Sequence, residues 1–169
     1  ILLAGAAALS LALPAAAQKT TLIVGMAAQD IGRIDPHLAP TTIDKVVVGW
    51  MFNGLVRFPP GTIDPARIEP DLAERWESSP DGKVWTFYLR RGVQFQQGFG
   101  ELTADDIVFS LKKAATAGQS AFTADFAAFE SVEAVDPYTV RITLKQVVPS
   151  LLGIVTNIHG GNIVSRKAV

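Results

Sequence analysis

One stretch, residues 72–111, constrains the fold more than any other part of the chain. It reads LAERWESSPDGKVWTFYLRRGVQFQQGFGELTADDIVFSL. The segment Ser79-Pro80-Asp81-Gly82 has the chemistry of a β-turn, because proline presets φ and glycine accepts unusual backbone angles. After it, apolar residues alternate with more polar ones, which is the period-two pattern of a strand with one buried face. We therefore predict a hairpin whose structural core residues are Trp85, Phe87 and Leu89.

A helix is predicted shortly after this hairpin. Thr103 has the position of an N-cap residue, and Asp106 stands three residues later, where a capping box has its acidic partner. Acidic residues in the first turn and Lys112 and Lys113 further along suit the helix dipole. Gly118 can end the helix. The apolar face expected from the 3.6-residue period comprises Ile107, Val108, Leu111, Ala114 and Ala115.

Regular structure is also predicted outside this stretch. A β-branched, apolar run at 20–26 predicts a first strand, and a second alternating hairpin is predicted around Asp136-Pro137-Tyr138. Thr41 and Asp44 repeat the capping-box pattern ahead of a helix. Its expected apolar face comprises Ile43, Val47, Trp50 and Met51. A short helix is expected over residues 150–155, and core packing is expected for Phe122, Phe126 and Phe129.

Residues 1–17 have the composition of a secretion signal. The run ILLAGAAALSLALPAAA is apolar and ends in an Ala-x-Ala pattern after Pro14. A membrane-spanning helix is the alternative, but such a helix needs about 20 apolar residues. A signal peptide implies a periplasmic protein that starts at Gln18 and has 169 − 17 = 152 residues. No cysteine follows the run, which argues against a lipid anchor.

Composition and motifs exclude several classes of function. Fifteen Lys and Arg residues against 16 Asp and Glu give a net charge of −1, with no basic stripe for nucleic acid. The two histidines, His37 and His159, lack the spacing of a metal site, and no nucleotide-binding or nucleophile motif occurs. Asp105 and Asp106 point about 100° apart on a helix, so they do not form an acid–base pair. We expect no enzyme activity, no cofactor and no metal.

The central stretch resembles a known family. Its residues follow the pattern LA-x-x-W-x-x-S-x-DG, then W-x-F-x-L-R-x-G-V-x-F, and finally LTA-D-D-I-V-F-S-L. This pattern is similar to that of the family 5 extracellular solute-binding proteins, the dipeptide-, oligopeptide- and nickel-binding subunits of ABC importers. One departure occurs at Gln96-Gln97-Gly98, where the family usually has His-Asp-Gly.

The resemblance implies an α/β fold of the bilobal, periplasmic binding protein type 2-like kind, of which only the N-terminal part is present. Four segments are expected. Residues 1–17 are the signal peptide with an incomplete n-region, and residues 18–58 are the first segment of the large lobe. Residues 59–158 form a small α+β lobe, and residues 159–169 return to the large lobe.

The resemblance also implies a function. The chain is expected to be a periplasmic, monomeric substrate-binding subunit that captures a solute between two lobes and delivers it to the membrane permease. Family ligands include di- and oligopeptides, nickel chelates, opines and saccharides, and a peptide is the first expectation. The alternative is an exported enzyme or interaction module whose active residues lie outside this sequence.

Two segments are predicted to line the binding cleft where the lobes join. One follows the first predicted strand, and the other lies at the return crossing; both are rich in glycine and polar groups. Phe122 is a third candidate because its position resembles that of a cleft aromatic in nickel-binding members. Instead of lining a cleft, the first segment could be a solvated connector, and Gly160-Gly161 in the second could simply form a turn. The complete candidate set is Asp30, Ile31, Gly32, Arg33, Asp35, Phe122, His159, Gly160, Gly161 and Asn162.

The signal peptide yields the first testable prediction. Cleavage after Ala17 is expected because an apolar segment of suitable length ends there in Ala-x-Ala. N-terminal sequencing of the periplasmic protein should start at Gln18. A protein that retains residues 1–17 would contradict the predicted location.

Overall fold

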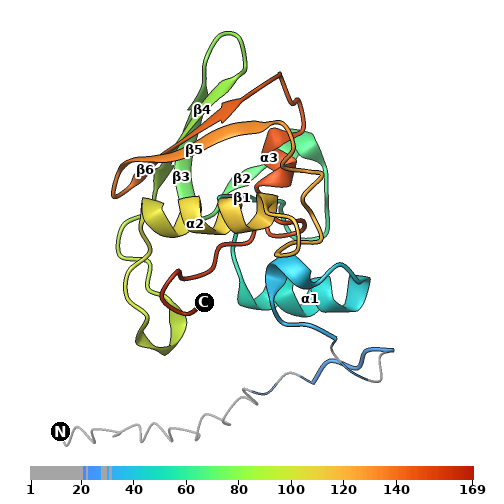
Figure 1. Cartoon of the computed structure of the whole chain (residues 1–169). Coiled ribbons are helices and arrows are strands. Elements are labelled where there is room, and N and C mark those ends of the chain that lie inside the picture. Colours follow the sequence, from blue (N-terminus) through green and yellow to red (C-terminus); the bar gives the residue numbers. More distant parts are fainter. Residues whose placement is uncertain (1–20, 22, 28–29, 31) are drawn as a thin grey trace, which may run out of the picture.

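The computed structural model describes residues 21, 23–27, 30 and 32–169. Its largest element is a four-stranded antiparallel sheet with the strand order β3-β4-β6-β5 (Figure 1). The strands are β3 (Ala73–Ser78), β4 (Val84–Leu89), β5 (Phe129–Asp136) and β6 (Thr139–Leu144). Both predicted hairpins are thus confirmed, and they meet where β4 pairs with β6.

One face of the sheet is buried. Phe87 lies opposite Val140 in the β4–β6 register, and both side chains are fully buried. Trp85, predicted with Phe87 and Leu89 to be structural, packs against this core but is only partly buried. It lies at the turn end of β4, where its indole Nε1 donates to the carbonyl of Gly82 at 3.1 Å. The polar end of the indole therefore reaches the turn.

Helix α2 (Ala104–Ala115) covers the buried face. Its N-terminus is capped as predicted, because Asp106 Oδ2 accepts from both the backbone N and the Oγ1 of Thr103 at 3.1 Å. Ala115, expected on the apolar face, is exposed, since it lies at the last position of the helix. The buried apolar residues of α2 are Ala104, Ile107, Leu111 and Ala114.

The remaining elements surround this core. They are a two-stranded sheet of β1 (Val56–Arg57) and β2 (Glu69–Pro70), the helices α1 (Thr42–Met51) and α3 (Leu151–Ile154), and three 3₁₀ turns. The turns are η1 (Pro36–Leu38), η2 (Pro65–Arg67) and η3 (Gln96–Gly98). The short helix expected after Pro149 is confirmed as α3. Phe122 and Phe126 are core residues as expected, although turns rather than a helix hold them.

Two connecting segments run side by side at Gly54. The backbone N of Leu55 donates to the carbonyl of Val155 at 3.0 Å, and the backbone N of Ile163 donates to that of Asn53 at 2.9 Å. A Cβ atom at Gly54 would stand 2.7 Å from the Val155 carbonyl oxygen, so any larger residue would push the segments apart. The glycine permits the close crossing.

Two predictions about the N-terminal part are wrong for this structure. The strand expected at 20–26 is absent from its described residues, which have no neighbouring strand to pair with; Ile23 is 89% exposed. In α1 the buried residues are Asp44 and Val48, whereas Trp50, expected on the apolar face, is 62% exposed. The 3.6-residue period identified a helix but not the side on which it packs.

Across the described part of the chain, no helix combines the length and hydrophobicity needed to cross a bilayer.

The core predicts a clear difference between two aromatic residues of β4. Phe87→Ala should lower the free energy of unfolding by about 3–5 kcal/mol, because it leaves a cavity under α2. Trp85→Ala should cost clearly less, since its ring is partly exposed. Chemical denaturation measures both changes in the free energy of unfolding. Ile63 is 73% exposed, so the control Ile63→Ala should stay within about 0.5 kcal/mol of wild type. Equal losses for Phe87 and Trp85 would contradict the assigned core.

Candidate functional site

Asp35 connects the N-terminal segment to α2. Its carboxylate oxygens each lie 2.8 Å from Lys113 Nζ, and Oδ1 also accepts from the backbone N of His37 at 3.0 Å. Partial burial raises the pKa of Asp35, but the hydrogen bond and charge of Lys113 and the His37 N–H outweigh it. The pKa of Asp35 therefore lies below its usual value, and the carboxylate is ionised.

His37 is completely buried beside this ion pair. Its Nδ1 lies 3.2 Å from Lys113 Nζ, and its Nε2 lies 3.0 Å from the carbonyl oxygen of Asn162. An ammonium group can only donate, so Nδ1 accepts and Nε2 carries the proton that is donated to Asn162. Burial, and then the charge of Lys113, lower the pKa of His37 to about 4. The ring is neutral at pH 7.

We call Asp35, His37, Lys113 and Asn162 the junction cluster, because they join three segments far apart in the sequence. Asn162 itself is 1% exposed, and its Nδ2 donates to the carbonyl of His159 at 2.9 Å. Its Oδ1 is buried without a hydrogen-bond partner among the described residues. His37 therefore holds the backbone of Asn162, while the carbonyl of His159 holds its side-chain amide.

Phe122 and His159 form a second group. Their ring centroids lie 6.4 Å apart in an edge-on arrangement, and Lys45 Nζ lies 5.2 Å from the centroid of Phe122. His159 Nδ1 is 3.6 Å from Asp125 Oδ2, and the His159 side chain is 48% exposed. Two of the predicted cleft residues thus meet where the buried ring of Phe122 borders the half-exposed ring of His159.

Gly160 and Gly161 are required by packing. A Cβ at Gly160 would stand 2.7 Å from the ring of Phe126, and one at Gly161 would stand 2.4 Å from the carbonyl oxygen of Thr156. This close packing accounts for both glycines through the protein interior. A role in approaching a ligand stays a prediction.

The other predicted residues lie near the start of α1. Gly32 and Arg33 donate their backbone N–H groups to Asp44 Oδ1 at 2.9 and 3.4 Å, and both line an open hollow that Ser120 and Ala121 also border. Asp30 lies just ahead of them, and Ile31 is outside the described residues. The candidate residues therefore form three neighbouring groups rather than one pocket.

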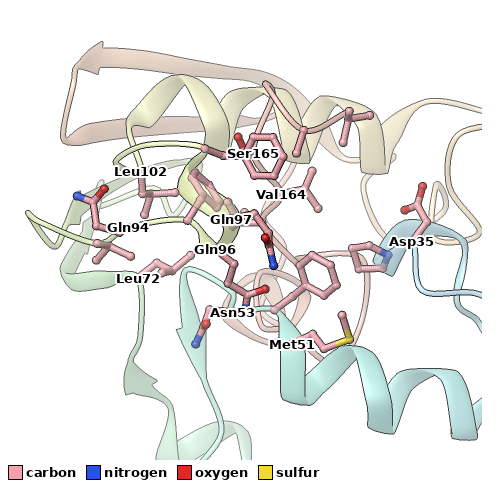
Figure 2. A pocket seen from close by; sticks show the side chains of 18 of the residues that line it. Asp35, Met51, Asn53, Leu72, Gln94, Gln96, Gln97, Leu102, Val164 and Ser165 are labelled. Carbon is pink, nitrogen blue, oxygen red and sulfur yellow. The ribbon is translucent and has the colours of Figure 1, made fainter.

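A separate cavity of about 390 Å³ lies between the loop 93–99, the end of α1 and the segment 163–169 (Figure 2). Of the predicted cleft residues, it includes only Asp35. Its apolar wall includes Phe52, Phe95 and Leu102, whereas its polar groups are mostly amides. These amides belong to Asn53, Gln94, Gln96 and Gln97.

Sequence reasoning missed His37 and Lys113. From the sequence, His37 belongs to the polar segment after the first predicted strand but not to the predicted site residues, and Lys113 is predicted only as a charge suited to the helix dipole. The available signal was that His37 directly follows Asp35-Pro36 in the polar segment already singled out. In the portion of the chain that the structure describes, no cluster of three or more His, Asp or Glu residues could hold a metal ion.

Comparison with known proteins decides the family. The sequence pattern of "Bacterial extracellular solute-binding proteins, family 5 Middle" matches residues 67–167. The chain belongs to this family. Family 5 proteins are solute-binding proteins for transport rather than enzymes, and the structural relatives place the chain in the α/β periplasmic binding protein fold of this type.

The family 5 relatives differ in the ligands that they are named for. Di/tripeptide-binding protein 4 of Pseudomonas aeruginosa is 35% identical over 159 residues, which are 83% of this chain and 29% of that protein. MoaA of A. tumefaciens R10, solved with mannopinic acid, is 53% identical with a TM-score of 0.82. The match covers 84% of this chain and 29% of the MoaA chain. NikZ of Campylobacter jejuni, solved with Ni(L-His), is 28% identical with a TM-score of 0.71, covering 83% and 26%. The chain therefore spans less than a third of the length of these relatives.

The buried histidine predicts a pH-dependent stability. The unfolded chain binds a proton at His37 near pH 6.5, whereas the folded chain does so only near pH 4, so stability should fall as the pH is lowered from 6.5 to 4. The expected loss is about 3 kcal/mol. Denaturation curves across this range measure it.

His37→Gln should flatten the curve between pH 6.5 and 4, because glutamine does not titrate. The control Ile63→Ala, at an exposed residue that does not titrate, should keep the wild-type slope. Equal slopes for wild type and His37→Gln would show that His37 is not the responsible group.

Proposed function

We propose that this chain is the N-terminal part of a periplasmic substrate-binding subunit of an ABC importer. In this proposal two lobes close on a small solute and present it to a membrane permease, while other subunits handle ATP. A ligand drives such a closure through its higher affinity for the closed state. The observation that carries the proposal is the family 5 match over residues 67–167.

The proposed ligand site comprises the segments 30–35 and 159–162 together with Phe122. Three contacts support this location. Phe122 packs against His159, the exposed ring of His159 is paired with Asp125, and Asp35 reaches Asn162 through Lys113 and His37. Glycine, amide, imidazole and aromatic groups at one junction offer the mixture of polar and apolar contacts that small-molecule sites use.

Two ligand classes are candidates. A di- or oligopeptide is supported by the similarity to Di/tripeptide-binding protein 4 over most of this chain. An opine-type acid is supported by the higher identity, 53%, to the protein solved with mannopinic acid. Both candidates carry a carboxylate, for which Arg33 and Lys45 are the proposed partners near the two halves of the site.

Titration calorimetry on the full-length protein separates these candidates. Mannopinic acid and dialanine should be tested separately against the same preparation. Binding of either supports a solute-binding function and assigns the ligand class. Binding of neither, in a protein with a cooperative thermal transition, would contradict both ligand proposals.

Single substitutions test the location of the site in full-length protein. Arg33→Ala and His159→Ala should each weaken binding by about tenfold, which corresponds to the loss of roughly one charged hydrogen bond. The Tm of the ligand-free form should change little, because neither side chain belongs to the core. Arg57→Ala, which removes an exposed arginine paired with Glu69, is the matched control and should bind normally. Wild-type affinity in both site variants would refute the location while leaving the family assignment intact.

A further inference from the structure

The junction cluster contains an unusual combination for a protein interior. A lysine ammonium, 9% exposed, stands between a carboxylate and a fully buried imidazole. A buried charge without a partner is strongly destabilising, so Lys113 requires Asp35. The imidazole is not needed to neutralise Lys113, since the carboxylate already does so. The position of His37 must therefore be explained by its other contact.

That other contact is the backbone of the return crossing. His37 Nε2 donates to the carbonyl of Asn162 at 3.0 Å, and the Asn162 side chain donates to the carbonyl of His159 at 2.9 Å. A chain of three hydrogen-bond contacts thus runs from Lys113 on α2, through His37, to the residue that carries the exposed imidazole of the proposed site. The donor and acceptor in each of these hydrogen bonds are fixed, because the ammonium allows only one neutral tautomer of His37.

We propose that His37 is a positioning residue, which holds the backbone of residues 159–162 in its binding geometry through the Nε2–H···O=C contact with Asn162. The proposal rests on the proposed function, since it assumes that this segment lines the ligand site. Lys113 is the partner that orients the ring, and Asp35 is the partner that holds Lys113.

The electrostatic surroundings of His37 make its contact with Lys113 dependent on the protonation state of the ring. The charged groups facing the ring are Lys113 from α2 and Asp35 from its own segment, while the return crossing contributes backbone groups of Gly160 and Asn162. Protonation of Nδ1 would remove the acceptor for Lys113 and place two cations 3.2 Å apart. The contact between Lys113 and His37 is therefore retained at neutral pH and lost in acid, whereas the Nε2–H of a protonated ring can still donate to Asn162.

A pair of substitutions of similar size isolates the hydrogen bond in the full-length protein. His37→Leu removes the donor to Asn162, whereas the amide of His37→Gln can still donate. With mannopinic acid or dialanine as the probe, we expect His37→Leu to weaken binding by about tenfold and His37→Gln to restore it to within about twofold. Wild-type affinity in the leucine variant, or equal weakening in both variants, would overturn the proposal.

Two measurements keep the test decisive if the leucine variant does not fold or if neither probe binds. In wild type, ring ¹⁵N chemical shifts should report the neutral Nε2–H tautomer at pH 7, and the Nδ1–H form or a cation would overturn the proposal. In Lys113→Met, Nδ1 loses the ammonium that fixes the tautomer, so a second neutral tautomer without the donor to Asn162 becomes possible. Amide exchange at residues 160–163 at pH 7 should therefore be faster than in wild type, and an unchanged exchange profile would also overturn the proposal. These measurements need no ligand, so they separate a failure of the positioning role from a failure of the proposed function.

Discussion

The packing of α2 against one face of the four-stranded sheet is the interaction on which the rest of the structure depends. It buries Ile107 and Leu111 against strand residues such as Phe87 and Val140. Burial of several large apolar side chains supplies most of the stabilisation that a unit of this size can obtain. The position of α2 in turn determines where its polar side chains lie.

Those polar side chains hold the segments that are not part of the sheet. Ser110 Oγ accepts from the backbone N of Val164 at 2.9 Å, and Asp106 Oδ1 accepts from that of Arg166 at 3.1 Å. Lys113, one turn further along, holds Asp35. One helix therefore packs on the core with its apolar face and binds the segment 164–166 and the N-terminal segment with its polar residues. The proposed ligand site lies where these two segments come together.

The sequence predicted best what depends on neighbouring residues. Both hairpins and the cap at Thr103 were predictable because turn chemistry, alternation and capping act within a few residues. The sequence did not predict which side of α1 is buried, since Trp50 and Val48 differ in exposure through contacts with distant segments. The same holds for the candidate site. Polar loops could be singled out, but the contact between His37 and Lys113 joins positions 76 residues apart, and only the folded chain brings them together.

Hydrogen exchange on the full-length protein, with and without a saturating ligand, tests most directly whether the junction is the binding site. The account predicts that ligand slows exchange at the amides of residues 32–33 and 160–162 and leaves β4, whose amides are already paired in the sheet, unchanged. Protection confined to other regions, with no change at either junction segment, would contradict it.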